Sequence, residues 1–70
     1  MTKYRAKQRF VYDVDGMGVR VGKDEILEFE PYYGKDKPDG PLVCKTWLYP
    51  EAANGKPWDR SIVEEFFERC

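Results

Sequence analysis

The stretch YRAKQRFVYDVDGMGVRVGKDEILEFE, residues 4–30, decides the fold of this chain. Apolar and polar residues alternate in three parts of it, and residues that favour turns separate those parts. Alternation with a period of two is typical of β-strands, because successive side chains of a strand point to opposite faces. The pattern predicts three strands, which cover Tyr4–Val14, Val19–Val21 and Ile26–Glu30.

Two short turns are expected to connect these strands. Asp13–Gly18 contains an Asp-Gly pair and a second glycine, which tolerate the positive φ angles of hairpin turns. Gly22-Lys23-Asp24 supplies the next turn. We therefore expect a meander of three short antiparallel strands, with Leu27 and Phe29 on one face of the third strand.

The remainder of the chain predicts two loops and a fourth strand. Pro31–Pro41 contains three prolines and two glycines, which is typical of a long loop. Leu42–Tyr49 is rich in β-branched and aromatic residues and is expected to form the strand. Pro50–Pro57 is the second loop. We expect Trp47 and Trp58 to lie in the core.

The last ten residues predict a short helix. Ser61 and Glu64 have the spacing of a capping box, and Asp59 is the alternative capping residue. Glu65 and Arg69 would form an i,i+4 pair on this helix. One apolar stripe at helical spacing would dock on the sheet, and it consists of Ile62, Val63, Phe66 and Phe67.

These elements define one small domain, residues 1–70, of the α+β class and mainly β. We expect a strongly bent antiparallel sheet or partial barrel in the order β-β-β-β-α, closed by the C-terminal helix. This order and the segment Gly18–Glu30 resemble the small barrels of the Src-homology-3-like type. The size and style of the chain also resemble small proteins of bacteriophages and prophages, and that resemblance implies binding to host machinery.

Composition argues against several classes of function. The 70 residues include no histidine, which is the commonest acid-base group near neutral pH and a common zinc ligand. The single serine, Ser61, is explained as a cap, and Cys44 has no histidine to activate it. We expect no enzyme, no metal site and no cofactor. The absence of a signal sequence and of a long apolar run predicts a cytoplasmic protein with reduced thiols.

Two segments are candidates for binding a partner. Basic residues occupy alternate positions near the start of the chain and would form a positive ribbon on one strand face; they are Lys3, Arg5, Lys7 and Arg9. Tyr32 and Tyr33 in the long loop are large, amphipathic side chains of the kind that interfaces favour. Together these six residues form the predicted contact surface.

The sequence allows several hypotheses for the partner. Another protein is favoured, because the pI of about 5.4 and the acidic segment 24–41 disfavour nucleic acid. Nucleic acid is the alternative, with bases stacked on exposed aromatic rings such as Trp47 and Tyr49. A homodimer through the edge of the first strand is a third possibility. The ribbon could instead form ion pairs with Glu28 and Glu30 across the sheet.

Overall fold

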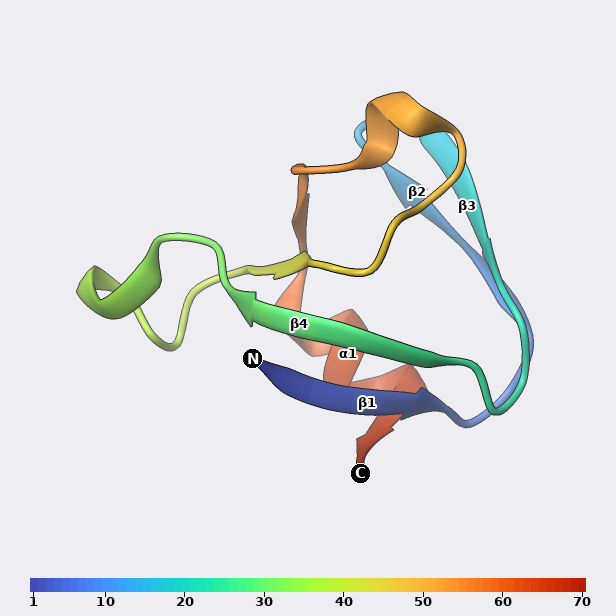
Figure 1. The fold of residues 1–70 in the computed structure, drawn as a ribbon, viewed down its shortest axis with the longest axis horizontal. Coiled ribbons are helices and arrows are strands. Elements are labelled where there is room, and N and C mark those ends of the chain that lie inside the picture. The colour runs from blue at the N-terminus through green and yellow to red at the C-terminus, as the bar shows by residue number, and fades with distance from the viewer.

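The computed structural model describes all 70 residues as two antiparallel sheets with one short helix (Figure 1). The strands are β1 (Thr2–Ala6), β2 (Phe10–Val14), β3 (Met17–Val21), β4 (Ile26–Pro31), β5 (Leu42–Cys44), β6 (Pro57–Trp58) and β7 (Phe67–Arg69). Helix α1 covers Arg60–Phe66, and two 3-10 turns cover η1 (Gly34–Asp36) and η2 (Glu51–Ala53). The larger sheet has the order β6-β5-β4-β1-β7, and β2 pairs with β3 alone. The fold is mainly β, as predicted, but its strands do not close into a barrel.

One long, bent hairpin forms the framework of the molecule. The residue numbers of every pair between β1 and β4 add up to 31, and so do those of every pair between β2 and β3. The chain from Thr2 to Val14 therefore runs alongside the chain from Met17 to Phe29 in a single register. Figure 1 shows that β1 and β4 run together and that β2 and β3 then turn away from them.

The turn at the tip of this hairpin is the one that the sequence predicts. Val14 pairs with Met17, so the loop has two residues, Asp15 and Gly16. Both have positive φ, 51° and 81°. Such a turn matches the twist of the flanking strands, which explains the Asp-Gly pair at this position.

The bend interrupts the predicted first strand and breaks the predicted meander. Lys7, Gln8 and Arg9 are all exposed, so the alternation that would keep every second side chain in the core fails there. On the opposite strand the bend falls at the predicted Gly22–Asp24 turn, where Asp24 has a φ of 68°. The predicted turn at Gly22–Asp24 is thus a bend and not a chain reversal, so β4 continues the arm of β3 and pairs with β1.

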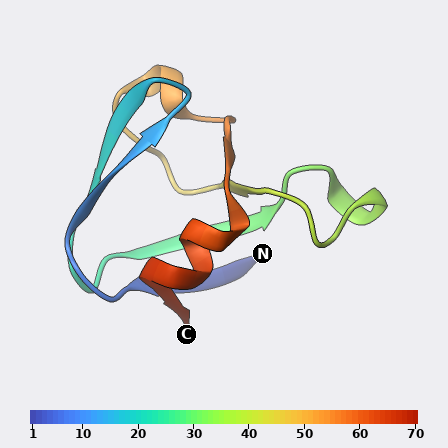
Figure 2. The same ribbon diagram turned by 180° about the vertical axis from the view of Figure 1, so that it is seen from behind.

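Aromatic rings fill the core between the larger sheet, the hairpin and α1. Trp58 is fully buried, and Phe29 and Phe67 meet it edge to face at ring distances of 5.2 and 6.3 Å. Tyr4 contacts both phenylalanines in the same manner. Leu27 and Phe29 lie on the inner face of β4 as predicted. Figure 2 shows α1 in front of β1 and β4.

The C-terminal segment differs from the predicted helix at both ends. Asp59 caps α1, because its carboxylate accepts hydrogen bonds from the N–H and hydroxyl of Ser61. Ser61 itself is therefore not the cap. The helix ends at Phe66, and Phe67–Arg69 pairs with β1 as an edge strand. Arg69 thus lies outside the helix and forms no i,i+4 pair with Glu65. No helix in the structure has the length and apolar character needed to cross a membrane.

Candidate binding surface

The six residues of the predicted contact surface lie in three different places. Lys3 and Arg5 project from β1 on the face opposite the core. Lys7 and Arg9 lie in the bend between β1 and β2. Tyr32 and Tyr33 belong to the loop after β4, which projects at the end of the larger sheet opposite the bend (Figure 1). The structure therefore does not gather the basic ribbon and the tyrosines into one continuous surface.

Acidic residues of neighbouring strands compensate the charge of β1. Arg5 forms an ion pair with Glu68, its register partner on β7, and this contact lowers the pKa of the Glu68 carboxyl. Lys3 lies opposite Glu28 on β4. The ion pairs with Glu28 and Glu30 that the sequence leaves open do not form, because Lys3 faces Glu28 without an ion pair and Glu30 pairs with Lys45. The acidic partner of the ribbon is Glu68, which the sequence did not indicate.

The edges of β1 are both occupied. β4 pairs with one edge and β7 with the other. The predicted first strand corresponds to β1 and β2. Its β1 part cannot pair with a second copy of the chain, because β7 covers the edge that β4 leaves open.

Other basic side chains have no acidic partner in the fold. The four ion pairs of the structure are Arg5–Glu68, Lys45–Glu30, Lys56–Asp15 and Arg60–Glu64. Arg9 and Arg20 form none. They flank a hollow of about 330 Å³ on the outer side of the β2–β3 hairpin, which Phe10 and Val11 also line. Val11, the register partner of Arg20, is 65% exposed.

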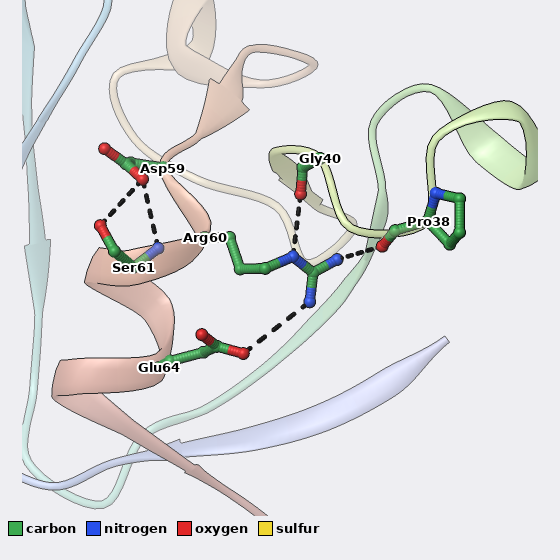
Figure 3. Close-up of polar contacts among 6 residues, drawn as sticks. All are labelled: Pro38, Gly40, Asp59, Arg60, Ser61 and Glu64. Carbon is green, nitrogen blue, oxygen red and sulfur yellow. Dashed lines mark hydrogen bonds and ion pairs between the residues drawn. The ribbon is translucent and has the colours of Figure 1, made fainter.

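The loop that contains Tyr32 and Tyr33 is held in place by α1. Arg60 donates hydrogen bonds to the backbone carbonyls of Pro38 and Gly40, while Glu64 lies 4.0 Å from its guanidinium (Figure 3). A guanidinium suits this task because its N–H groups form a rigid, planar fork. The tyrosine rings are exposed and meet edge to face at 5.0 Å.

A second aromatic pair lies in the segment after β5. The predicted fourth strand stops at Cys44, so Trp47 and Tyr49 belong to an irregular segment. Their side chains are 58% and 76% exposed, and the expectation of a core position for Trp47 is wrong. Trp47 and Tyr49 line a hollow of about 350 Å³ together with Arg20 and other residues of β3.

Asn54 fixes the shape of this segment. Its side-chain oxygen accepts a hydrogen bond from the Leu48 N–H at 2.8 Å, and its amide donates to the Leu48 carbonyl at 2.9 Å. Leu48 is buried between the two exposed aromatics. The exposure of Trp47 and Tyr49 is therefore a consequence of this backbone arrangement, in which the intervening leucine points into the core.

The other side of the hollow is a free strand edge. No strand pairs with β3 except β2. In a hairpin with a two-residue loop, Val14 and Met17 form a hydrogen-bonded pair, and bonded and non-bonded pairs then alternate. Gly18 and Arg20 fall in the non-bonded pairs, so their backbone N–H and C=O groups point away from β2. No backbone hydrogen bond outside the regular elements involves either residue.

Sequence reasoning missed this edge because it placed Ile26–Glu30 beside Val19–Val21. The signal that could have found it is the length of the hairpin. The two-residue turn fixes the register of the hairpin, and the register identifies the residues of β3 whose backbone groups point away from β2. These groups are free only because β3 has no second neighbour.

The structure contains no cluster of three or more Cys, Asp or Glu side chains that could bind a metal ion. Cys44 is buried, and burial raises the pKa of its thiol to about 11. The hydrogen bonds to Thr46 oppose this shift. Cys44 therefore stays a protonated thiol near neutral pH.

No protein-family model, no curated protein and no solved structure matches this chain. Its class is thus defined by its own geometry: a small, mainly β fold with an exposed aromatic pair beside a free strand edge.

Proposed function

We propose that this chain is a small, non-enzymatic binding protein that engages another protein. The observation that carries the proposal is the hollow of about 350 Å³ between Trp47, Tyr49 and the free edge of β3. Its volume falls in the range of about 300–1,000 Å³ that is typical of ligand sites. Three other hollows on the surface do so too, and what distinguishes this one is its exposed tryptophan and tyrosine. Exposed Trp and Tyr are the side chains that most often anchor protein interfaces.

Charge favours a protein over a nucleic acid as the partner. Arg5 is paired with Glu68, and Lys3 faces Glu28, so β1 does not present an uncompensated row of cations. Nucleic-acid interfaces are much more positive than this surface.

The cytoplasmic location and the likeness to bacteriophage proteins that bind host machinery remain predictions from the sequence. The predicted surface with Lys3, Arg5, Lys7, Arg9, Tyr32 and Tyr33 also remains a prediction, and it competes with the hollow as the place of contact.

Affinity capture from native lysate, with and without nuclease, tests the proposal when it is done with paired variants. Trp47→Ala with Tyr49→Ala should abolish recovery of a stoichiometric protein partner that survives nuclease. Tyr32→Ala with Tyr33→Ala is the matched control, because it removes a second exposed aromatic pair outside the hollow. We expect the control to retain the partner.

Other outcomes point elsewhere. Loss of the partner in the Tyr32/Tyr33 variant alone would move the contact to the long loop. Arg5→Glu with Lys7→Glu should leave protein capture intact, whereas recovery of nuclease-sensitive material that this variant loses would support the nucleic-acid alternative. If no variant changes any capture, neither surface binds a partner.

A further inference from the structure

We propose that the partner contributes an extended segment with an acidic side chain, which pairs with β3 as an additional strand. This inference rests on the proposed function and specifies how the hollow is filled. The backbone groups of Gly18 and Arg20 would form the hydrogen bonds, and the partner's carboxylate would lie opposite Arg20. Trp47 and Tyr49 would cover the added strand.

The unused backbone groups are the first reason. A strand edge with free N–H and C=O groups is a template for another strand, and strand addition is a common mode of peptide recognition. Here the free groups of Gly18 and Arg20 open onto a hollow that is already bounded by aromatic rings. Proteins protect free edges with proline, a bulge, charged side chains or a covering loop. β3 has no proline and no bulge, and η2 lies near it without hydrogen bonds to Gly18 or Arg20.

Gly18 is the second reason, because the fold itself does not need a glycine there. Its φ is not positive, unlike that of Gly16 at the turn. A Cβ added at Gly18 would meet only the side chain of Val11, at 3.4 Å, which is an ordinary contact. Glycine within a strand weakens it, and it often marks a place where another backbone approaches closely.

Charge complementarity is the third reason and gives the chemistry of the partner. Arg20 has no ion pair in the fold, and neither does Arg9 on the adjacent part of the outer face. Glu25, at the same hollow, does not supply this partner: its carboxylate accepts a hydrogen bond from the Gly22 N–H at 2.9 Å and forms no ion pair with Arg20. An acidic side chain opposite Arg20 would supply the missing cross-strand partner.

Three blocked pentapeptides provide the test: TVEVT, the same peptide with lysine at the centre, and TVEVT with two N-methylated amides. Each peptide, and oligothymidine as the nucleic-acid probe, is titrated into the ¹⁵N-labelled protein to millimolar concentration. TVEVT should shift the amide signals of Gly18 and Arg20 and the indole signal of Trp47. Glutamate should bind about two- to fivefold more tightly than lysine, as expected for an exposed ion pair. N-methylation should abolish binding, because it removes backbone donors.

A charge reversal sharpens the experiment. Arg20→Glu should invert the preference, so that the lysine peptide binds more tightly than TVEVT. Lys35→Glu, which reverses a charge in the long loop, should leave the preference unchanged.

Four results would overturn the inference. These are the absence of shifts at Gly18 and Arg20, equal binding of the N-methylated peptide, shifts caused by oligothymidine but by no peptide, and a concentration-dependent self-association that occupies β3. In each case the capture experiment with the Trp47 and Tyr49 variants still decides the proposed function independently. Loss of capture in that variant, without strand pairing, would leave a binding protein that recognises its partner in another manner.

Discussion

At the scale of single residues, Trp58 contributes more contacts to the core than its position in a two-residue strand suggests. Its ring meets those of Tyr12, Phe29 and Phe67, and its indole N–H has no hydrogen-bond partner. Trp58→Ala should reduce the free energy of unfolding by about 3–5 kcal/mol, the usual range for a buried tryptophan. Trp47→Ala, an exposed substitution, should change it by about 0.5 kcal/mol. Urea denaturation followed by circular dichroism measures both, and equal losses would contradict the assignment.

The sequence predicts a core position for both tryptophans, and only the structure separates them. The local sequence points the wrong way: Trp47 lies in the apolar stretch Trp47-Leu48-Tyr49 and is exposed, whereas Trp58 lies between Pro57 and Asp59 and is fully buried. What distinguishes Trp47 is the adjacent Leu48, which Asn54 turns inward through two hydrogen bonds. A contact between side chains and backbone six residues apart has no periodic signature, so the pattern could not reveal it.

Cys44 should make stability depend on pH in the alkaline range. Its pKa is raised by burial from 9.0 to about 11 in the folded chain. Between these pH values the unfolded chain loses the thiol proton while the folded chain keeps it, so the free energy of unfolding falls as pH rises. Below about pH 9 the thiol is protonated in both states, so Cys44 makes its full contribution to the free energy of unfolding there. The difference in unfolding free energy between the wild type and Cys44→Ala, measured across this range, isolates the effect from tyrosines and lysines. A pH-independent difference would contradict it.

At the scale of elements, Arg60 couples α1 to the long loop. It donates to the carbonyls of Pro38 and Gly40, and it is largely shielded from solvent. Arg60→Lys retains the charge but loses the fork that reaches both carbonyls, and we expect it to cost about 1–3 kcal/mol. The amide protons of Tyr32 and Gly40, which bond within the loop, should exchange faster.

Glu64→Gln is the matched control for the Arg60 variant. It removes an ion pair of 4.0 Å with an exposed carboxylate but leaves both contacts to the loop. Stability and exchange should stay close to those of the wild type, since exposed pairs contribute little. Equal effects of the two variants would mean that the helix, and not the loop contact, depends on Arg60.

The prediction of elements succeeded where one local rule decides the outcome. The Asp-Gly turn, the inward face of β4 and the loop of Pro31–Pro41 follow directly from turn chemistry and alternation. The C-terminal boundary did not, because Phe67 fits both an apolar helical stripe and the inward position of a strand. Pairing with β1 decides between the two, and it is a contact with residues more than sixty positions away.

At the scale of the whole molecule, the bend of the hairpin determines which surfaces are free. Sequence alternation predicts strands at Tyr4–Val14 and Ile26–Glu30, but not that the chain folds over between Lys7 and Arg9. If Gly22–Asp24 reversed the chain, as the predicted meander requires, β4 would lie beside β3 and cover its edge; in the structure β4 continues the arm of β3 and pairs with β1. The candidate hollow is therefore a property of the tertiary arrangement, which the sequence did not indicate, since it predicted a core position for Trp47.

The two sheets should nevertheless unfold together, because rings from the β2–β3 half of the hairpin enter the common core. Phe10 stacks on Phe66 at a ring distance of 4.8 Å, and Tyr12 contacts Trp58 at 4.6 Å. Phe10→Ala should lower the free energy of unfolding of the entire chain by roughly 2–3 kcal/mol, somewhat less than for a fully buried phenylalanine. The measurement uses a Trp47→Phe background, in which Trp58 is the only tryptophan. Trp58 fluorescence and far-ultraviolet circular dichroism should report the same single transition, both with Phe10 and with Phe10→Ala. The contrary result would be a loss of β-structure in the Phe10 variant at a urea concentration where Trp58 is still buried. The β2–β3 hairpin would then unfold independently, and the shared core would not fix the position of the β3 edge.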